Sequence, residues 1–151
     1  MTEQHTLEYL QRTLDECLDT LENNDLELFG VDGSEWAIAH RLAVYLEPLF
    51  PGWNIDCEYN RQGEDTNEKR GTDGRLRRPD IIIHRRKLLA RSDNLLIIEL
   101  KKENSLQDLE KACDFTTPPQ GKRRFQYQFG LAVSFDPQRE LAWFSNGIKQ
   151  A

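Results

Sequence analysis

The sequence has few of the residues that build disulfide frameworks, zinc sites or membrane spans. Its three cysteines, Cys17, Cys57 and Cys113, are widely spaced and form no Cys-x-x-Cys pair. An odd, scattered set argues against disulfides and zinc and predicts reduced thiols in a cytoplasmic protein. No apolar run approaches the roughly 20 residues of a membrane helix, so no membrane partner is expected. The acidic, polar N-terminus is unlike a secretory signal.

Basic residues are nearly absent from the first 60 positions, which hold two Lys/Arg against thirteen Asp/Glu. Residues 61–91 reverse this balance, with ten Lys/Arg against five Asp/Glu. A phosphate-bearing ligand would therefore be drawn to the middle of the chain. The net charge of -6 argues against tight, non-specific binding to duplex DNA. The acidic first segment is a candidate docking face for a partner protein or for a second subunit of a homodimer.

The patterning of apolar residues predicts an α/β protein. The 151 residues fit one domain. Leucine recurs every three or four positions and predicts an amphipathic helix over residues 6–23. Ser34 is a suitable N-cap for a second, largely apolar helix that ends at Pro48–Gly52.

Strands are expected where apolar residues alternate or run continuously. Their predicted ranges are 53–59, 80–84, 95–101 and 125–135, with a short fifth at 140–144. A helix is predicted over residues 106–115. Residues 60–78 are polar, contain three glycines and predict a long, mobile loop. This order predicts one mixed sheet with helices on both faces.

Two carboxylates and a lysine are expected to meet at the end of this sheet. Side chains alternate across a strand, so Glu99 and Lys101 share a face. If residues 85–94 close a hairpin, the natural register places His84 beside Leu95 and Asp80 beside Glu99. The two carboxylates would then lie about 5 Å apart on one face.

This arrangement favours a divalent cation. At an effective dielectric near 20, two such charges repel by about 3 kcal/mol. Hard oxygen ligands suit Mg²⁺, which takes one or two carboxylates and keeps several waters. The carbonyl of Leu100 is a candidate further ligand. A solvated cluster of ion pairs at a strand end is the alternative interpretation, but both halves of the pattern lie on the edges of apolar strands, which favours a functional site.

Arg78-Pro79-Asp80-Ile81-Ile82-Ile83 followed by Leu96-Ile97-Ile98-Glu99-Leu100-Lys101 resembles the motif of the PD-(D/E)XK nuclease superfamily. That superfamily includes many restriction endonucleases, junction resolvases and repair exonucleases. The resemblance implies a restriction-endonuclease-like, three-layer α/β/α core over residues 34–135, with residues 1–30 as an added N-terminal helical extension of a single domain, 1–151.

The resemblance also implies roles for individual residues. Asp80 and Glu99 would bind Mg²⁺, with Mn²⁺ as a substitute, and Lys101 would position the attacking water or stabilise the transition state. Glu35 matches the glutamate that the superfamily often adds from its first core helix. Glu35 also lies in the first turn of its helix, where a favourable interaction with the helix dipole explains it equally well.

Residues around the motif are candidates for gripping nucleic acid. Basic side chains flank Asp80 on both sides, either as phosphate ligands or as solvated loop residues: Lys69, Arg75, Arg77, Arg78, Arg85 and Arg86. Gln126 and Gln128 are expected on one face of the fourth strand, where they could touch a base edge or form an edge-strand polar face.

The predicted function is Mg²⁺-dependent hydrolysis of phosphodiester bonds in nucleic acid, DNA rather than RNA. A carboxylate-held metal activates water and relieves charge on the phosphate, and a nearby lysine stabilises developing negative charge. The alternative is a catalytically silent module that kept the fold and binds a partner protein or nucleic acid. The intact Asp80, Glu99 and Lys101 set favours the enzyme.

Overall fold

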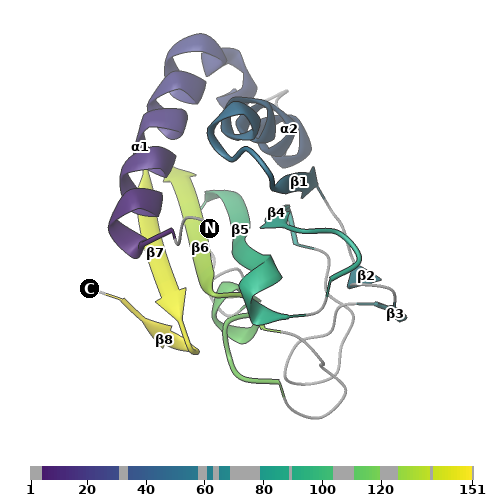
Figure 1. The fold of residues 1–151 in the computed structure, drawn as a ribbon. Coiled ribbons are helices and arrows are strands. Elements are labelled where there is room, and N and C mark those ends of the chain that lie inside the picture. The colour runs from purple at the N-terminus through teal and green to yellow at the C-terminus, as the bar shows by residue number, and fades with distance from the viewer. Residues whose placement is uncertain are drawn as a thin grey trace. The chain divides into compact units, whose positions relative to one another are not determined.

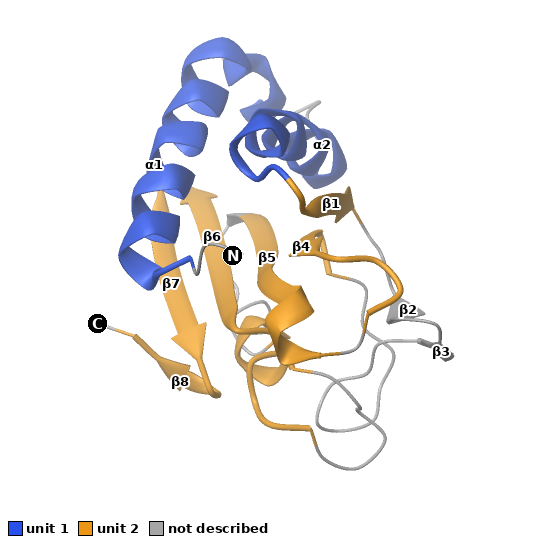
Figure 2. Cartoon of the chain, in the orientation of Figure 1, with its two compact units in different colours: residues 1–51 blue, residues 52–151 orange. Residues whose placement is uncertain are grey.

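The two long helices precede the large sheet along the chain (Figures 1 and 2). Two helices lie in the first unit, Met1–Pro51, and the sheet lies in the second, Gly52–Ala151. The computed structural model describes residues 5–30, 34–57, 61–62, 65–68, 79–88, 90–103, 111–119, 126–136 and 138–150. The boundary between the units falls within the predicted core, after the second helix, and a single domain stays a prediction.

The first helix, α1 (Leu7–Asn24), matches its predicted range to within one residue. The Thr6 hydroxyl caps it by accepting the backbone N–H of Tyr9 at 3.1 Å. Leu10, Leu14, Leu18 and Leu21 are fully buried, as the leucine spacing predicted. Cys17 is buried with them, and this burial raises the pKa of its thiol to about 11, so the thiol is protonated and unreactive at neutral pH.

The second helix, α2 (Glu35–Leu46), begins after the predicted cap. The Ser34 hydroxyl accepts the N–H of Ala37 at 3.1 Å. Ile38, Leu42 and Leu46 are fully buried, and short 3₁₀ turns at Leu26–Phe29 and Glu47–Leu49 flank the helix. No helix among the described residues combines the length and the apolarity needed to cross a membrane.

The second unit is built on a six-stranded mixed sheet with the strand order β1-β4-β5-β6-β7-β8. Only β5 and β6 run parallel to each other among these neighbours, and the other pairs are antiparallel. The strands are β1 (Asn54–Cys57), β4 (Ile81–His84), β5 (Asn94–Glu103), β6 (Phe129–Asp136), β7 (Glu140–Ser145) and β8 (Ile148–Lys149). The mixed α/β class is therefore confirmed.

Three details of the predicted element order were wrong. Residues 60–78 contain a short antiparallel hairpin, β2 (Arg61–Gln62) with β3 (Asp65–Glu68), where only a loop was expected. Strand β6 begins at Phe129, so Gln126 and Gln128 precede it. Strand β8 was not predicted, although the Asn146-Gly147 pair before it is a hairpin signal: both residues have positive φ, 54° and 75°, as a type I′ turn requires.

The registers assign every residue of the central strands to one of two faces. One face carries Ile81, Ile83, Leu96, Ile98, Leu100, Leu131 and Val133, all at most 2% exposed. The opposite face carries Ile82 and Ile97, which pack with Phe115 and Tyr127. It also carries Ala132, Ala142 and Phe144, which pack with Ala112. We call this second face the site face, because Glu99 and Lys101 lie on it.

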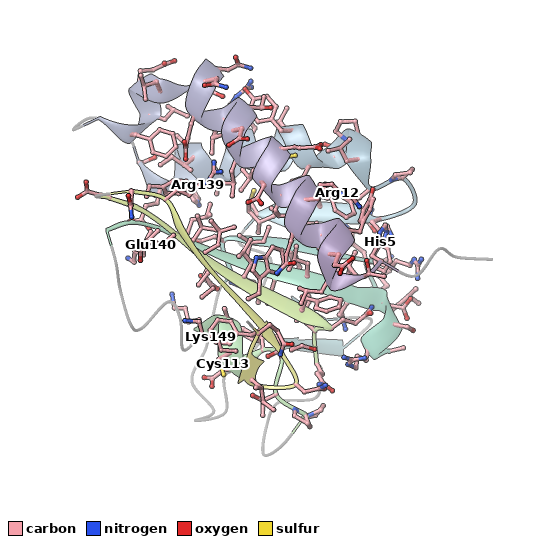
Figure 3. All side chains as sticks on the ribbon, turned by 90° about the vertical axis from the view of Figure 1, so that its left-hand side faces the viewer. His5, Arg12, Cys113, Arg139, Glu140 and Lys149 are labelled. Carbon is pink, nitrogen blue, oxygen red and sulfur yellow. The ribbon has the colours of Figure 1, made fainter. Side chains whose placement is uncertain are left out.

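A helical segment, residues 111–114, covers part of the site face. It approaches so closely that a Cβ on Gly130 would lie 2.5 Å from the carbonyl oxygen of Ala112. The Cys113 thiol donates to the Gly147 carbonyl at 3.1 Å and ties the segment to the turn before β8; Lys149 of β8 lies near Cys113 (Figure 3). Of the predicted helix 106–115, residues 106–110 lie outside the described residues.

Candidate functional site

Asp80 and Glu99 lie at the same end of the β4–β5 hairpin. The hairpin pairs Ile81 with Ile98 and Ile82 with Ile97. Continuing this register by one residue places Asp80 opposite Glu99, on the face that also carries Lys101. Directly opposed side chains in antiparallel strands lie about 5 Å apart at Cβ. The register therefore agrees with the prediction at this end of the hairpin.

At the other end of the hairpin the predicted register was wrong. His84 pairs with Asn94, not with Leu95, because a bulge shifts the register between Ile83 and His84. A bulge adds one residue to one strand and bends it locally. The shift lies beyond Ile83 and leaves the pairing next to Asp80 unchanged.

The Asp80 carboxylate reaches across to the backbone of β5. Its Oδ2 atom accepts the N–H of Leu100 at 2.7 Å. Among the described pairs, the backbone pairing of β5 with β4 ends at Ile98. At Leu100 the Asp80 side chain therefore accepts the N–H that a strand carbonyl would otherwise accept. The N–H and C=O groups of one strand residue point the same way. The Leu100 carbonyl is therefore directed to the Asp80 side, as expected of a further ligand.

Glu99 is the most deeply buried carboxylate of the site. It is 1% exposed and neighbours Ala132 in the β5–β6 register. Burial of an ionised carboxylate is costly unless a cation or hydrogen bonds compensate for it. Asp80 and Lys101 are each half-buried on the same face. Two carboxylates and a carbonyl form an oxygen donor set of the kind that suits Mg²⁺, whose remaining ligands are usually waters.

This donor set is small. The residues that the structure describes contain no group of three or more His, Cys, Asp or Glu side chains placed to hold a metal ion. A two-carboxylate site is compatible with Mg²⁺, which commonly keeps most of its water ligands. It does not suit zinc, which prefers three or four nitrogen or sulfur ligands.

Strand β6 adds a serine to the site that the sequence analysis missed. Ser134 is registered with Lys101, and the residue is 8% exposed. Because registered residues of neighbouring strands share a face, Ser134 continues the polar end of the site face. Alternation from Gly130 through Ala132 to Ser134 was visible in the sequence, but the pairing of β6 with β5 was not.

A second polar cluster lies on the site face, between β1 and β4, because Asp56 is registered with Ile82. Asp56 binds His84 Nε2 through Oδ2 at 2.7 Å, and Arg86 Nε donates to the same oxygen at 2.8 Å. Arg86 also pairs with the other oxygen of Asp56. His84 is 1% exposed, and its bond to Asp56 satisfies the buried imidazole. Burial tends to raise the pKa of Asp56, but the hydrogen bonds from Arg86 and His84 outweigh it and hold that pKa well below its usual range.

We expect the Asp56 cluster to make stability depend on acid pH. A carboxyl whose pKa is lowered on folding contributes stability above its unfolded pKa of about 4, and loses it as pH falls toward the folded value. The free energy of unfolding, measured by urea titration at pH 7, 4 and 3, should therefore fall more steeply below pH 4 in the natural protein than in Asp56→Asn. Glu140→Gln, at an exposed carboxylate, controls for the loss of a charge. Equal slopes in the natural protein and Asp56→Asn would contradict this assignment.

The two arginines predicted to grip nucleic acid after β4 are held by carboxylates. Arg86 pairs with Asp56 as described above. Arg85 pairs with Asp93 at 3.2 Å and lies over the ring of Trp53, 4.0 Å from its centroid. Both guanidinium groups therefore anchor the β4–β5 hairpin to neighbouring elements. A nucleic-acid role stays a prediction for them and would require each to serve a phosphate in addition.

The two glutamines bond to segments that lie next to the start of β6. Gln126 Nε2 donates to the Thr116 carbonyl at 2.8 Å and to Asn146 Oδ1 at 3.0 Å. The backbone N–H of Gln128 donates to the Asn94 carbonyl at 2.9 Å. Because both residues precede β6, the expectation that they share one face of a strand was wrong. These hydrogen bonds hold the segment that leads into β6 in place.

The remaining candidates lie outside the second unit or outside the described residues. Glu35 is half-buried in the first turn of α2, in the first unit. Lys69, Arg75, Arg77 and Arg78 lie outside the described residues.

Comparison of the chain with protein-family models, curated proteins and solved structures found no match.

Proposed function

We propose that the protein is a Mg²⁺-dependent nuclease that hydrolyses phosphodiester bonds, with DNA as its substrate class. One observation carries this proposal. The β4–β5 register, continued by one residue, aligns Asp80 with Glu99 on the face that carries Lys101, and the Asp80 carboxylate is held against β5 by the Leu100 N–H at 2.7 Å. Carboxylates and an amine brought together in this way match the needs of phosphoryl chemistry.

The proposed roles follow from the side chains. Asp80 and Glu99 would hold Mg²⁺ or Mn²⁺, with the Leu100 carbonyl as a further ligand. The bound ion would supply an activated water and charge neutralisation. Lys101 would stabilise the negative charge that develops on phosphate as water adds to phosphorus and the bond to the leaving oxygen breaks. The products are a phosphate monoester and a free hydroxyl.

A restriction-endonuclease-like fold is the matching structural proposal. Its support is the order of α2, the β1–β4–β5 meander, the helical segment 111–114 and the parallel strand β6. A hairpin that presents the acidic pair, followed by a helical crossover to a parallel neighbour of the central strand, is the order that the motif requires. A cytoplasmic location belongs to the same proposal and rests on the three free thiols.

The direct test is incubation of the full chain with end-labelled single-stranded, duplex and branched DNA. The buffer contains either EDTA or Mn²⁺ or Mg²⁺ at about 5–10 mM, a concentration that saturates weak sites. We expect cleavage with either ion and none in EDTA. A matched single-stranded RNA should be cut more slowly. Absence of cleavage of every substrate, with a melting temperature that Mn²⁺ does not change, would overturn the nuclease proposal.

The competing proposal is a catalytically silent module. The pairing of Arg85 and Arg86 with Asp93 and Asp56 favours it, because these guanidinium groups are already compensated. DNA binding by gel shift without cleavage, unchanged by Asp80→Asn, would support the silent module. Cleavage that Asp80→Asn abolishes would exclude it.

A further inference from the structure

A line of three polar residues crosses the sheet beside the proposed nuclease centre. Lys101 on β5 is registered with Ser134 on β6, and Ser134 is registered with Glu140 on β7. Because registered residues share a face, all three lie on the site face. The preceding line is Glu99, Ala132 and Ala142, in which the two neighbours of the carboxylate are apolar. Besides Asp80 and Glu99, the polar neighbours of the site are therefore the residues registered across the sheet from Lys101.

Ser134 and Glu140 differ in burial and in distance from Lys101. Ser134 is 8% exposed, whereas Glu140 is exposed and lies at the start of β7, away from the turn to β8 (Figure 3). Adjacent strands are about 4.8 Å apart, so Ser134 is one strand away and Glu140 about twice as far. The Lys101 side chain would have to extend past Ser134 on β6 before its ammonium group could approach Glu140 on β7.

A serine hydroxyl suits the task of orienting an ammonium group. It has one donor hydrogen and two acceptor lone pairs, so it can accept from an ammonium while donating to another group. It carries no charge, so it restrains the lysine without cancelling the positive charge that phosphate would use. A carboxylate at the same position would do the opposite, because an ion pair would compete with the substrate.

We propose that Ser134 is a positioning residue whose hydroxyl accepts a hydrogen bond from the Lys101 ammonium and aims it at the Asp80–Glu99 pair. The catalytic part of this inference rests on the proposed function. The structural part, an ordered Lys101 ammonium that depends on Ser134, does not. Glu140 is then a bystander at the edge of the sheet.

The first measurement is independent of catalysis. Side-chain ¹⁵N relaxation of the lysine ammonium groups should show a Lys101 signal, assigned by its loss in Lys101→Ala, that is more ordered than that of the exposed Lys149. Ser134→Ala, and the nearly isosteric Ser134→Cys if the alanine variant does not fold, should make the Lys101 signal as mobile as that of Lys149. Glu140→Gln should leave the Lys101 signal ordered. Mobility that appears in Glu140→Gln but not in the Ser134 variants would overturn the proposal.

The second measurement is kinetic. Ser134→Ala should lower kcat about tenfold with little change in KM, as expected for loss of one hydrogen bond to a charged group. Ser134→Thr, which keeps the hydroxyl, should recover most of the rate, and Ser134→Ala should cost nothing further in a Lys101→Ala background. Ser145→Ala is the matched control. It removes a hydroxyl on β7 that donates to the Gln128 carbonyl at 3.1 Å.

The outcomes separate the two proposals. An active natural protein in which the Ser134→Ala and Lys101→Ala losses are additive would overturn the positioning role and leave the nuclease standing. An inactive natural protein with a Ser134-dependent, ordered Lys101 would overturn the nuclease and support the hydrogen bond. An inactive protein whose Lys101 is mobile would overturn both.

Discussion

Lys101→Ala should reduce Mn²⁺-dependent DNA cleavage by about 100- to 1,000-fold, the usual cost of removing one preorganised group that stabilises transition-state charge. Lys101 lies two residues after Glu99 on the same face of β5, half-buried and beside the Asp80–Glu99 pair. The loss should appear in kcat, measured under single-turnover conditions with saturating protein. The melting temperature should change little, because this side chain is not part of the apolar core.

Lys149→Ala provides the matched control. This lysine is exposed on β8, on the side of the unit that carries Cys113 (Figure 3), and its removal also deletes one positive charge. If the two variants lose activity to the same small extent, the effect is one of overall charge, and Lys101 has no role in the chemistry. A large loss confined to Lys101→Ala supports the proposed centre.

Gly130→Ala should destabilise the protein by about 2–3 kcal/mol, which lowers the melting temperature by roughly 5–10 °C for a chain of this size. An added Cβ would lie 2.5 Å from the Ala112 carbonyl oxygen and 3.0 Å from Cγ2 of Thr116. The first of these atoms is backbone, so relief requires the helical segment 111–114 to move off the sheet. Urea unfolding at constant m-value measures the change.

Gly30→Ala is the control for the general effect of replacing glycine. Among the described residues its added Cβ would meet only the Glu27 carbonyl, at an ordinary 3.4 Å, and Gly30 has a φ of -78° that alanine adopts freely. We expect this variant to be neutral or slightly more stable, because alanine restricts the unfolded chain. A Gly130→Ala protein as stable as Gly30→Ala would show that the segment does not pack on β6 as described.

Much of the candidate site was predictable because it depends on local pattern. A leucine every three or four residues specifies the buried face of α1, and a serine before an apolar stretch specifies the start of α2. Two apolar runs joined by a ten-residue connector specify a hairpin. Once that hairpin forms, alternation alone assigns Asp80, Glu99 and Lys101 to one face.

Other features depended on contacts between segments distant in the sequence. Asp56 and Arg86 are 30 residues apart. Nothing in the sequence near Arg86 indicates that its guanidinium forms an ion pair with a carboxylate on β1. Gln126 and Gln128 look like the polar residues of a strand, yet β6 begins only at Phe129, and the Gln126 side chain is bonded to Thr116 and Asn146. Local propensity was overruled there by tertiary contacts.

The sequence by itself determined the amphipathic helices, the apolar strands and the grouping of two carboxylates with a lysine, since each follows from the period with which side chains leave a helix or a strand. The tertiary structure alone decided which strand lies on the side of β5 opposite β4. That pairing brought Ser134 next to Lys101 and placed Gly130 beneath Ala112. A parallel partner is joined through a long crossover, so its register is set by packing over the whole sheet and is not encoded in any short stretch of residues.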